Sequence, residues 1–147
     1  MEYAGGRAWG RVRRTARIGG ETVAGEKILI VDDNVQIRML VKAALMSGGY
    51  QLIEATDGEM GLETAITEMP DLVLLDVTMP KLDGFEVLQF MRKRKETEYT
   101  KVMMLTTAGQ PSDVQYGYTL GVIGYLVKPF EPAQLREAVA KALSTSV

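Results

Sequence analysis

Hydrophobic and polar positions divide the chain into short apolar runs and longer segments in which apolar residues recur at helical spacing. The apolar runs show little alternation with polar residues, which is typical of strands that are buried on both faces of a parallel sheet. We predict five strands from these runs, at residues 27–33, 51–55, 72–76, 102–105 and 124–127.

Between these runs, apolar residues recur three and four positions apart, which is the spacing of one face of an α-helix. We predict five helices, whose inward-facing residues lie at 37–45, 62–69, 87–91, 114–121 and 135–143. Strands that alternate with helices in this way indicate an α/β fold. The expected architecture is a doubly wound, five-stranded parallel sheet with right-handed crossovers and helices on both faces.

Two of the predicted helices carry features that bear on the surface of the domain. The third leads into Arg92 to Glu98, a charged run that we interpret as solvent-exposed. The fourth is rich in glycine, which weakens its helical propensity, and its inward-facing residues would include Gly117, Tyr118 and Gly121. We interpret Tyr116 and Tyr118 as core residues, with a partner-binding surface as the alternative.

Composition narrows the chemistry that is available. The chain has 147 residues, 46% of them hydrophobic, which is enough for one domain with a buried core. It contains no cysteine and no histidine, which excludes disulfides, thiolate catalysis, Ser-His triads and the usual zinc sites. No apolar run approaches the roughly 20 residues that span a bilayer, and the first residues lack the apolar middle of a signal peptide. We therefore expect a soluble, cytoplasmic protein.

Charge is distributed unevenly along the chain. Residues 1–25 contain five Arg and six Gly against two Glu, so they carry a net charge of +3, while residues 26–147 carry −5. Their apolar residues follow no helix or strand period, so we predict a basic, Gly/Arg-rich and poorly ordered extension followed by one domain at 26–147. An arm that binds nucleic acid or a membrane is the alternative, although five Arg beside a single Trp are a weak signal.

Polar side chains stand at the ends of four of the five predicted strands. Asp32 and Asp33 end the first, Asp76 ends the third, Thr106 follows the fourth and Lys128 follows the fifth. The carboxyl ends of parallel strands share one edge of the sheet, so these residues can meet. Three carboxylates there would repel one another or take up protons, and a hard divalent cation such as Mg²⁺ relieves the repulsion. With the positive charge of Lys128, this edge would cradle a phosphoryl group attacked by an Asp76 oxygen.

The motifs at this edge resemble those of a known family. They are the acidic pair Asp32-Asp33, the D-x-x-M-P-x-x-D-G block from Asp76 to Gly84, Thr106, and the sequence GYLVKPF from Gly124 to Phe130. In this order and spacing they are similar to the receiver domain of two-component response regulators, most of all the single-domain chemotaxis type. The resemblance covers about four fifths of the chain. It implies a flavodoxin-like sheet with strand order 2-1-3-4-5.

By this resemblance, each matching residue has an expected role. Asp76 would accept a phosphoryl group from a phosphohistidine of a sensor histidine kinase or a phosphotransfer protein. Mg²⁺ would be bound by Asp33, Asp76 and the main-chain carbonyl of Thr78, with Asp32 acting through a metal-bound water. Lys128 would pair with the phosphoryl oxygens, and the peptide bond that follows it, to a proline, would be cis.

The same resemblance implies a conformational switch. Thr106 would move to hydrogen-bond the phosphate, and Tyr125 would turn inward into the space that Thr106 leaves. The signal would be read on residues 112–144, which form the fourth helix, the fifth strand and the fifth helix, by a downstream protein or by a second copy of the chain. We expect a phosphoacceptor rather than an enzyme. Its output would run through protein contacts and not through nucleic acid, because no DNA-binding domain follows Val147.

Three positions bear on the phosphorylated state. Thr107 stands where the family usually has a very small residue, so access to the site is expected to be tighter. Thr78 and Ala108 occupy positions that influence hydrolysis of the acyl phosphate in relatives, and neither is acidic or amide-bearing. We therefore expect slow self-dephosphorylation.

Three other functional classes fit the sequence less well. An aspartyl-phosphate phosphohydrolase would use a similar set of groups, but it carries a D-x-D motif after its first strand, whereas Asp32 and Asp33 are adjacent. A flavin carrier would need a hydroxyl- and glycine-rich phosphate loop, and residues 32–38, DDNVQIR, would repel a flavin phosphate. A receiver-like scaffold that is never phosphorylated is the remaining alternative, and failure to bind Mg²⁺ would distinguish it.

Overall fold

The computed structural model describes residues 17–18, 21–22, 25–107 and 111–145. The predicted basic extension at residues 1–25 lies mostly outside these described residues. Within it, β1 (Arg17–Ile18) and β2 (Glu21–Thr22) pair as an antiparallel two-stranded sheet.

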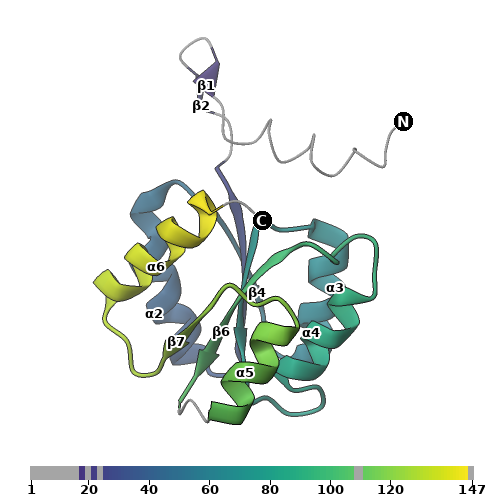
Figure 1. Cartoon of the computed structure of the whole chain (residues 1–147). Helices are drawn as coiled ribbons and strands as arrows, with labels where there is room; N and C mark the ends of the chain where they lie inside the picture. Colours follow the sequence, from purple (N-terminus) through teal and green to yellow (C-terminus); the bar gives the residue numbers. More distant parts are fainter. Residues whose placement is uncertain (1–16, 19–20, 23–24, 108–110, 146–147) are drawn as a thin grey trace.

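The central sheet has five parallel strands, as the apolar runs predicted (Figure 1). They are β3 (Lys27–Val31), β4 (Gln51–Ala55), β5 (Leu72–Asp76), β6 (Lys101–Thr106) and β7 (Gly124–Val127). Their spatial order is β4-β3-β5-β6-β7, which is the predicted 2-1-3-4-5 order. The register places Val31 beside Leu75 and Asp76 beside Leu105, so the carboxyl ends of these neighbouring strands are level.

Five α-helices lie in the described residues, of which four connect successive strands and the fifth follows β7. They are α2 (Val35–Leu45), α3 (Gly58–Glu68), α4 (Gly84–Arg92), α5 (Pro111–Thr119) and α6 (Pro132–Ser144), and a short 3₁₀ turn, η1 (Met46–Gly48), extends α2. Helices α2 and α6 cover one face of the sheet, and α3, α4 and α5 lie on the other (Figure 1). Within the described part of the chain, no helix is both long and apolar enough to cross a bilayer.

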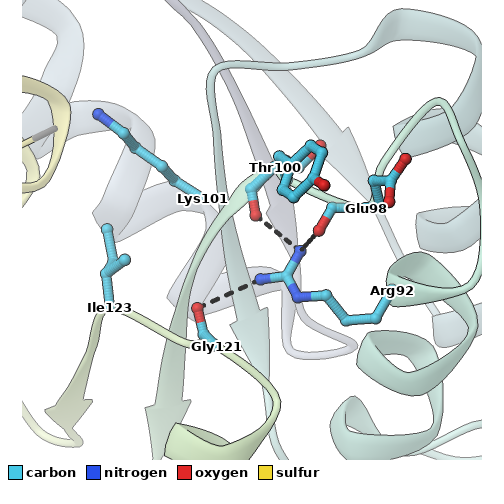
Figure 2. A pocket seen from close by; sticks show the side chains of 7 residues that line it. Arg92, Glu98, Thr100, Lys101, Gly121 and Ile123 are labelled. Atoms are coloured by element: carbon cyan, nitrogen blue, oxygen red, sulfur yellow. Dashed lines mark hydrogen bonds between the residues drawn. The ribbon is translucent and has the colours of Figure 1, made fainter. Parts of the chain in front are cut away.

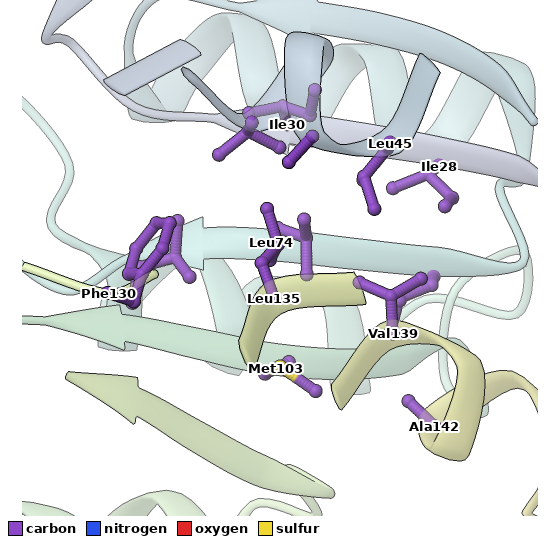
Figure 3. Close-up of a cluster of buried hydrophobic side chains, with 13 residues drawn as sticks. Ile28, Ile30, Leu45, Leu74, Met103, Phe130, Leu135, Val139 and Ala142 are labelled. Carbon is purple, nitrogen blue, oxygen red and sulfur yellow. The ribbon is translucent and has the colours of Figure 1, made fainter. Parts of the chain in front are cut away.

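Side chains of each inner strand point alternately to the two faces, and both faces are buried. In β3, Ile28 and Ile30 join the cluster under α2 and α6, while Leu29 and Val31 join the cluster under α3 and α4. Figure 3 shows the first cluster, in which Leu135 and Val139 of α6 pack toward the strand residues. Burial on both faces explains why these strands read as continuous apolar runs.

Helix α5 differs from the sequence prediction. Among residues 113–120, the buried or half-buried ones are Val114, Gly117 and Leu120, which follows the helix. Tyr118, predicted to face inward, is 51% exposed, and Gly121 is an exposed residue beyond the helix with a φ of 83°. The interpretation of Tyr116 and Tyr118 as core residues is therefore wrong, because small Gly117 occupies the inward position where Tyr125 packs.

The prediction that the charged run at residues 92–98 is solvent-exposed is wrong for its first residue, Arg92. Arg92 is half-buried, and its guanidinium donates hydrogen bonds to main-chain carbonyls on two segments (Figure 2). Before β6 the acceptors are the carbonyls of residues 97, 98 and 100, and after α5 they are those of Leu120 (2.7 Å) and Gly121 (3.3 Å). Arg92 also lines a pocket of about 140 Å³ at the amino ends of β6 and β7. The carbonyls at the end of α5 carry partial negative charge and attract a cation, which explains why the Arg92 guanidinium is half-buried and not fully exposed.

Candidate functional site

The structure brings the predicted site residues to the carboxyl edge of the sheet. Asp32 and Asp33 follow the last residue of β3, and Asp76 is the last residue of β5. Carboxylate oxygens of these three residues all lie within 4.8 Å of one another. Thr106 ends the neighbouring strand β6, and Lys128 directly follows β7. The site predicted from strand ends therefore assembles in three dimensions.

Lys128 links the two buried carboxylates of the cluster. Its Nζ donates to Asp32 Oδ2 at 2.8 Å and to Asp76 Oδ1 at 3.2 Å. Asp32 is fully buried and Asp76 is 5% exposed, whereas Asp33 is exposed. The lysine is placed by its backbone, because its N–H donates to the carbonyl of Thr106 at 2.6 Å. The Lys128-Pro129 peptide that follows is cis, as predicted.

The loop after β5 packs against the main chain of Asp76. The N–H of Val77 donates to the carbonyl of Leu105 (2.9 Å), and the N–H of Gly84 returns to the carbonyl of Val77 (2.8 Å). A Cβ at position 84 would overlap the main-chain oxygen of Asp76, so only glycine allows this approach. Asp83 then caps α4 through a reciprocal capping box with Glu86. The Asp-Gly pair therefore starts a helix and also packs against the phosphoacceptor candidate.

Electrostatics at the site favour an added cation. Burial, and then the charge of Asp32, raise the pKa of Asp76 to about 6, although Lys128 acts in the opposite direction. Burial acts to lower the pKa of Lys128, but its hydrogen bond to Asp32 and the charges of both carboxylates outweigh burial and raise it. One ammonium thus faces three carboxylates, and negative charge is in excess.

These residues fit a divalent cation with oxygen ligands. The three carboxylates are hard donors close enough to share one ion, and the exposed Asp33 leaves a side open to water. Thr78 contributes a main-chain N–H, which donates to Asp76 Oδ1 at 3.3 Å. Its role as a carbonyl ligand stays a prediction, as do the separate roles of Asp32 and Asp33.

The two predicted switch residues lie on adjacent strands. Thr106 is buried at the end of β6, and Tyr125 is half-buried on β7. The Tyr125 hydroxyl donates to the carbonyls of Asp113 (2.9 Å) and Val114 (3.2 Å) on α5. A Cβ at Gly117 would overlap this hydroxyl. Tyr125 therefore ties the edge strand to α5 in this state, while the movement of both residues stays a prediction.

Sequence reasoning missed several residues beside the site. Val35 and Met39 on α2 are 55% and 61% exposed, so an apolar stripe begins directly after the acidic pair. Their position off the inward face could have been read from the helical period. Buried Arg38 had no such signal, because a charged residue is expected to be exposed. Among the predicted positions, Thr107 is exposed and Ala108 lies outside the described residues.

Comparison with known proteins gives a consistent result. A family model described as the response regulator receiver domain matches residues 28–140. Sporulation initiation phosphotransferase F of Bacillus subtilis is 39% identical over 118 residues, which cover 80% of this chain and 94% of that protein. The transcriptional regulatory protein PhoP of alkaline phosphatase synthesis, also from B. subtilis, is 41% identical over 121 residues, which cover 82% of this chain and 50% of PhoP. The chain thus spans about half the length of the curated transcriptional regulators that it matches.

Solved structures show the same fold. Chemotaxis protein CheY4 of Vibrio cholerae superposes with a TM-score of 0.75 at 36% identity, covering 80% of this chain and 98% of CheY4. The receiver domain of sensor histidine kinase PA1611 from Pseudomonas aeruginosa, described with a magnesium ion in its active site cleft, gives a TM-score of 0.75 at 28% identity, with 83% and 100% coverage. Family model, relatives and fold agree, and the chain belongs to the response regulator receiver domains of two-component signalling systems.

Proposed function

We propose that Asp76 is the phosphoacceptor and takes its phosphoryl group from a phosphohistidine on a sensor histidine kinase or phosphotransfer protein. The observation that carries this proposal is the position of Lys128, whose ammonium bridges Asp32 and Asp76 inside a cluster of three carboxylates. A lysine and acidic residues at one strand edge suit phosphoryl transfer, which needs positioning and charge stabilisation more than covalent groups.

The placement of these groups supports such a transfer. An oxygen of the Asp76 carboxylate attacks phosphorus, the phosphorus–nitrogen bond of phosphohistidine breaks, and the imidazole leaves with its electron pair. In this structure Lys128 donates a hydrogen bond to Asp76 Oδ1, and during transfer its ammonium would turn to the phosphoryl oxygens. Asp33 and Asp76 would hold Mg²⁺, with Asp32 acting through water, and the bound ion would supply positive charge to the phosphoryl group. The exposed Asp33 marks the open side through which the donor approaches.

We infer that the donor docks on the apolar stripe formed by Val35 and Met39 of α2. Asn34 caps α2 by accepting from the N–H groups of Gln36 (2.8 Å) and Ile37 (3.2 Å), so the stripe begins with the helix, two residues after Asp33. A phosphohistidine domain places its reactive nitrogen next to Asp76, and a partner that approaches from the side of the exposed Asp33 would reach the start of this helix. Both apolar side chains are more than half exposed in the free domain, which suits contact with such a partner.

The output side of the proposal rests on Thr106 and Tyr125. Phosphate at Asp76 would draw the Thr106 hydroxyl toward it, and Tyr125 would release its hydrogen bonds to Asp113 and Val114 as it turns inward. The face at residues 112–144 would then differ between the two states and select a downstream protein or a second copy of the chain. Several relatives are named transcriptional regulators, so nucleic acid could be the final target of a longer regulator.

Intact mass after incubation with Mg²⁺ and acetyl phosphate tests the acceptor. We expect the wild type and the control Asp57→Asn, which lies at the cap of α3, to gain one phosphoryl group, and Asp76→Asn to gain none. The mass-shifted species should decay slowly, because Thr78 carries no acid or amide. Equal gain by Asp76→Asn would refute the assignment. No gain in any protein, without Mg²⁺ binding, would favour the phosphorylation-independent scaffold.

A further inference from the structure

A buried arginine lies directly behind the carboxylate cluster. Arg38 of α2 is 9% exposed, and its guanidinium donates in two directions. Nη1 donates to the main-chain carbonyl of Asp32 at 2.7 Å, and Nε donates to Glu54 Oε1 at 2.9 Å. Arg38 is thus joined to the backbone of the site and to strand β4, and neither of these two bonds goes to a carboxylate of the cluster.

The bond to Asp32 fixes a peptide that has left the sheet. Asp32 follows the last residue of β3, its N–H donates to the carbonyl of Ala55 at 3.2 Å, and its own carbonyl accepts from Arg38. Because Asp32 is fully buried, loss of the arginine would leave this carbonyl without its charged donor. With its N–H and its carbonyl both held, the Asp32 backbone fixes the direction in which the Asp32 side chain leaves it. The Asp32 carboxylate accepts from Lys128 Nζ and from the N–H of Asn34 at 2.9 Å.

Glu54 holds the other side of the guanidinium. Its carboxylate accepts from Arg38 through Oε1 and from Lys42 Nζ at 2.6 Å through Oε2. The hydrogen bond from Lys42, and also that from Arg38, lower the pKa of Glu54 despite partial burial, so the carboxylate stays charged. A continuous chain of contacts therefore runs from the surface of α2 through Glu54 and Arg38 to Asp32.

We propose that Arg38 is a positioning residue of the acidic site, which orients Asp32 for Mg²⁺ and phosphoryl binding and is itself held by Glu54. This inference rests on the proposed function in that Mg²⁺ is the ion of the site. Arg38 acts through the backbone, so its removal should change the geometry of the ion site more than its charge. Groups that orient metal ligands typically change metal affinity 10- to 100-fold when mutated.

The test uses Mg²⁺ alone, titrated by calorimetry well below the unfolding temperature of each variant. Arg38→Met removes the donors while keeping bulk, and we expect it to raise the Kd for Mg²⁺ about tenfold or more. Arg38→Lys, which can still reach one acceptor, should recover part of the affinity, and Glu54→Gln should weaken binding by a smaller factor. Arg94→Met, at an exposed arginine that pairs with Glu96 outside this chain of contacts, is the matched control and should stay within about twofold of the wild type.

Phosphorylation by acetyl phosphate, followed against Mg²⁺ concentration, gives a second readout. Positioning predicts a higher Mg²⁺ concentration for half-maximal rate in Arg38→Met, with the rate largely recovered at saturating ion. A folded Arg38→Met with wild-type Mg²⁺ affinity would overturn the proposal and leave Arg38 a purely structural residue. If Arg38→Met does not fold, unchanged affinity in both Arg38→Lys and Glu54→Gln would overturn it. A wild type that binds Mg²⁺ but gains no phosphoryl group would refute the proposed function alone.

Discussion

Replacement of Asp76 by Asn should stabilise the metal-free protein at neutral pH. In the folded domain, burial and then the charge of Asp32 raise the pKa of Asp76 from 3.8 to about 6. The folded protein therefore binds a proton at Asp76 more tightly than the unfolded chain does. The stability associated with this proton is complete below pH 3.8 and is lost as the pH rises through about 6. Above that pH, the charged carboxylate opposes folding.

The magnitude follows from the same shift. The difference between 3.8 and about 6 corresponds to about 3 kcal/mol, which is a large part of the roughly 5–15 kcal/mol that stabilises a typical domain. Asparagine has nearly the same volume and keeps an acceptor for Lys128 and for the N–H of Thr78. The substitution should therefore recover most of this energy with little loss of packing.

Urea unfolding followed by circular dichroism in EDTA measures the effect. At about pH 7.5, Asp76→Asn should unfold with a free energy about 2–3 kcal/mol above the wild type, and the gain should shrink toward zero at about pH 4. Asp33→Asn, at the exposed carboxylate, should change stability by under about 0.5 kcal/mol. Mg²⁺ should stabilise the wild type and not Asp76→Asn. A variant that is no more stable than the wild type at pH 7.5, or a gain that persists at pH 4, would refute the reasoning.

Three further outcomes are expected. Gly84→Ala should lower the free energy of unfolding by about 3 kcal/mol, because its Cβ would overlap the carbonyl of Asp76; a change under about 0.5 kcal/mol in urea unfolding would contradict this. Arg92→Met should cost about 2–4 kcal/mol in the same assay, since five carbonyls lose their donor, yet Mg²⁺ affinity measured by calorimetry should not change. Met39→Asp should slow phosphotransfer from a histidine kinase that phosphorylates the wild type by about tenfold, while labelling by acetyl phosphate, measured by intact mass, stays equal. Equal slowing with both donors would exclude a docking role.

The sheet and the site could be predicted because both depend on local signals. Strands buried on both faces must be apolar throughout, so their positions were visible to within two residues. The side chains that end β3, β5, β6 and β7 share one edge in any parallel sheet, so the meeting of Asp76 with Lys128 followed from topology. Neither inference needed knowledge of a distant contact.

Features that depend on distant partners could not be predicted. Arg92 reads as a surface charge until the carbonyls of Leu120 and Gly121 are placed beside it. Arg38 is similar, because its acceptors come from a strand end and a neighbouring strand. In α5, glycine leaves the helical face ambiguous, and the packing of Tyr125 on Gly117 decides which side turns inward. Long polar side chains and small residues carry too little local information for such assignments.

The hydrogen bonds of Arg92 fix the carboxyl end of α5, so this helix can move only by tilting about that end. The guanidinium holds the carbonyls of Leu120 and Gly121, while the opposite end, Pro111, follows the segment that begins at Thr106. Nine residues make a helix about 13 Å long, so a tilt of about 10° about the held end moves Pro111 by about 2 Å. A small displacement that reaches α5 from the proposed phosphoryl site would therefore be largest at Pro111 and vanish near Leu120.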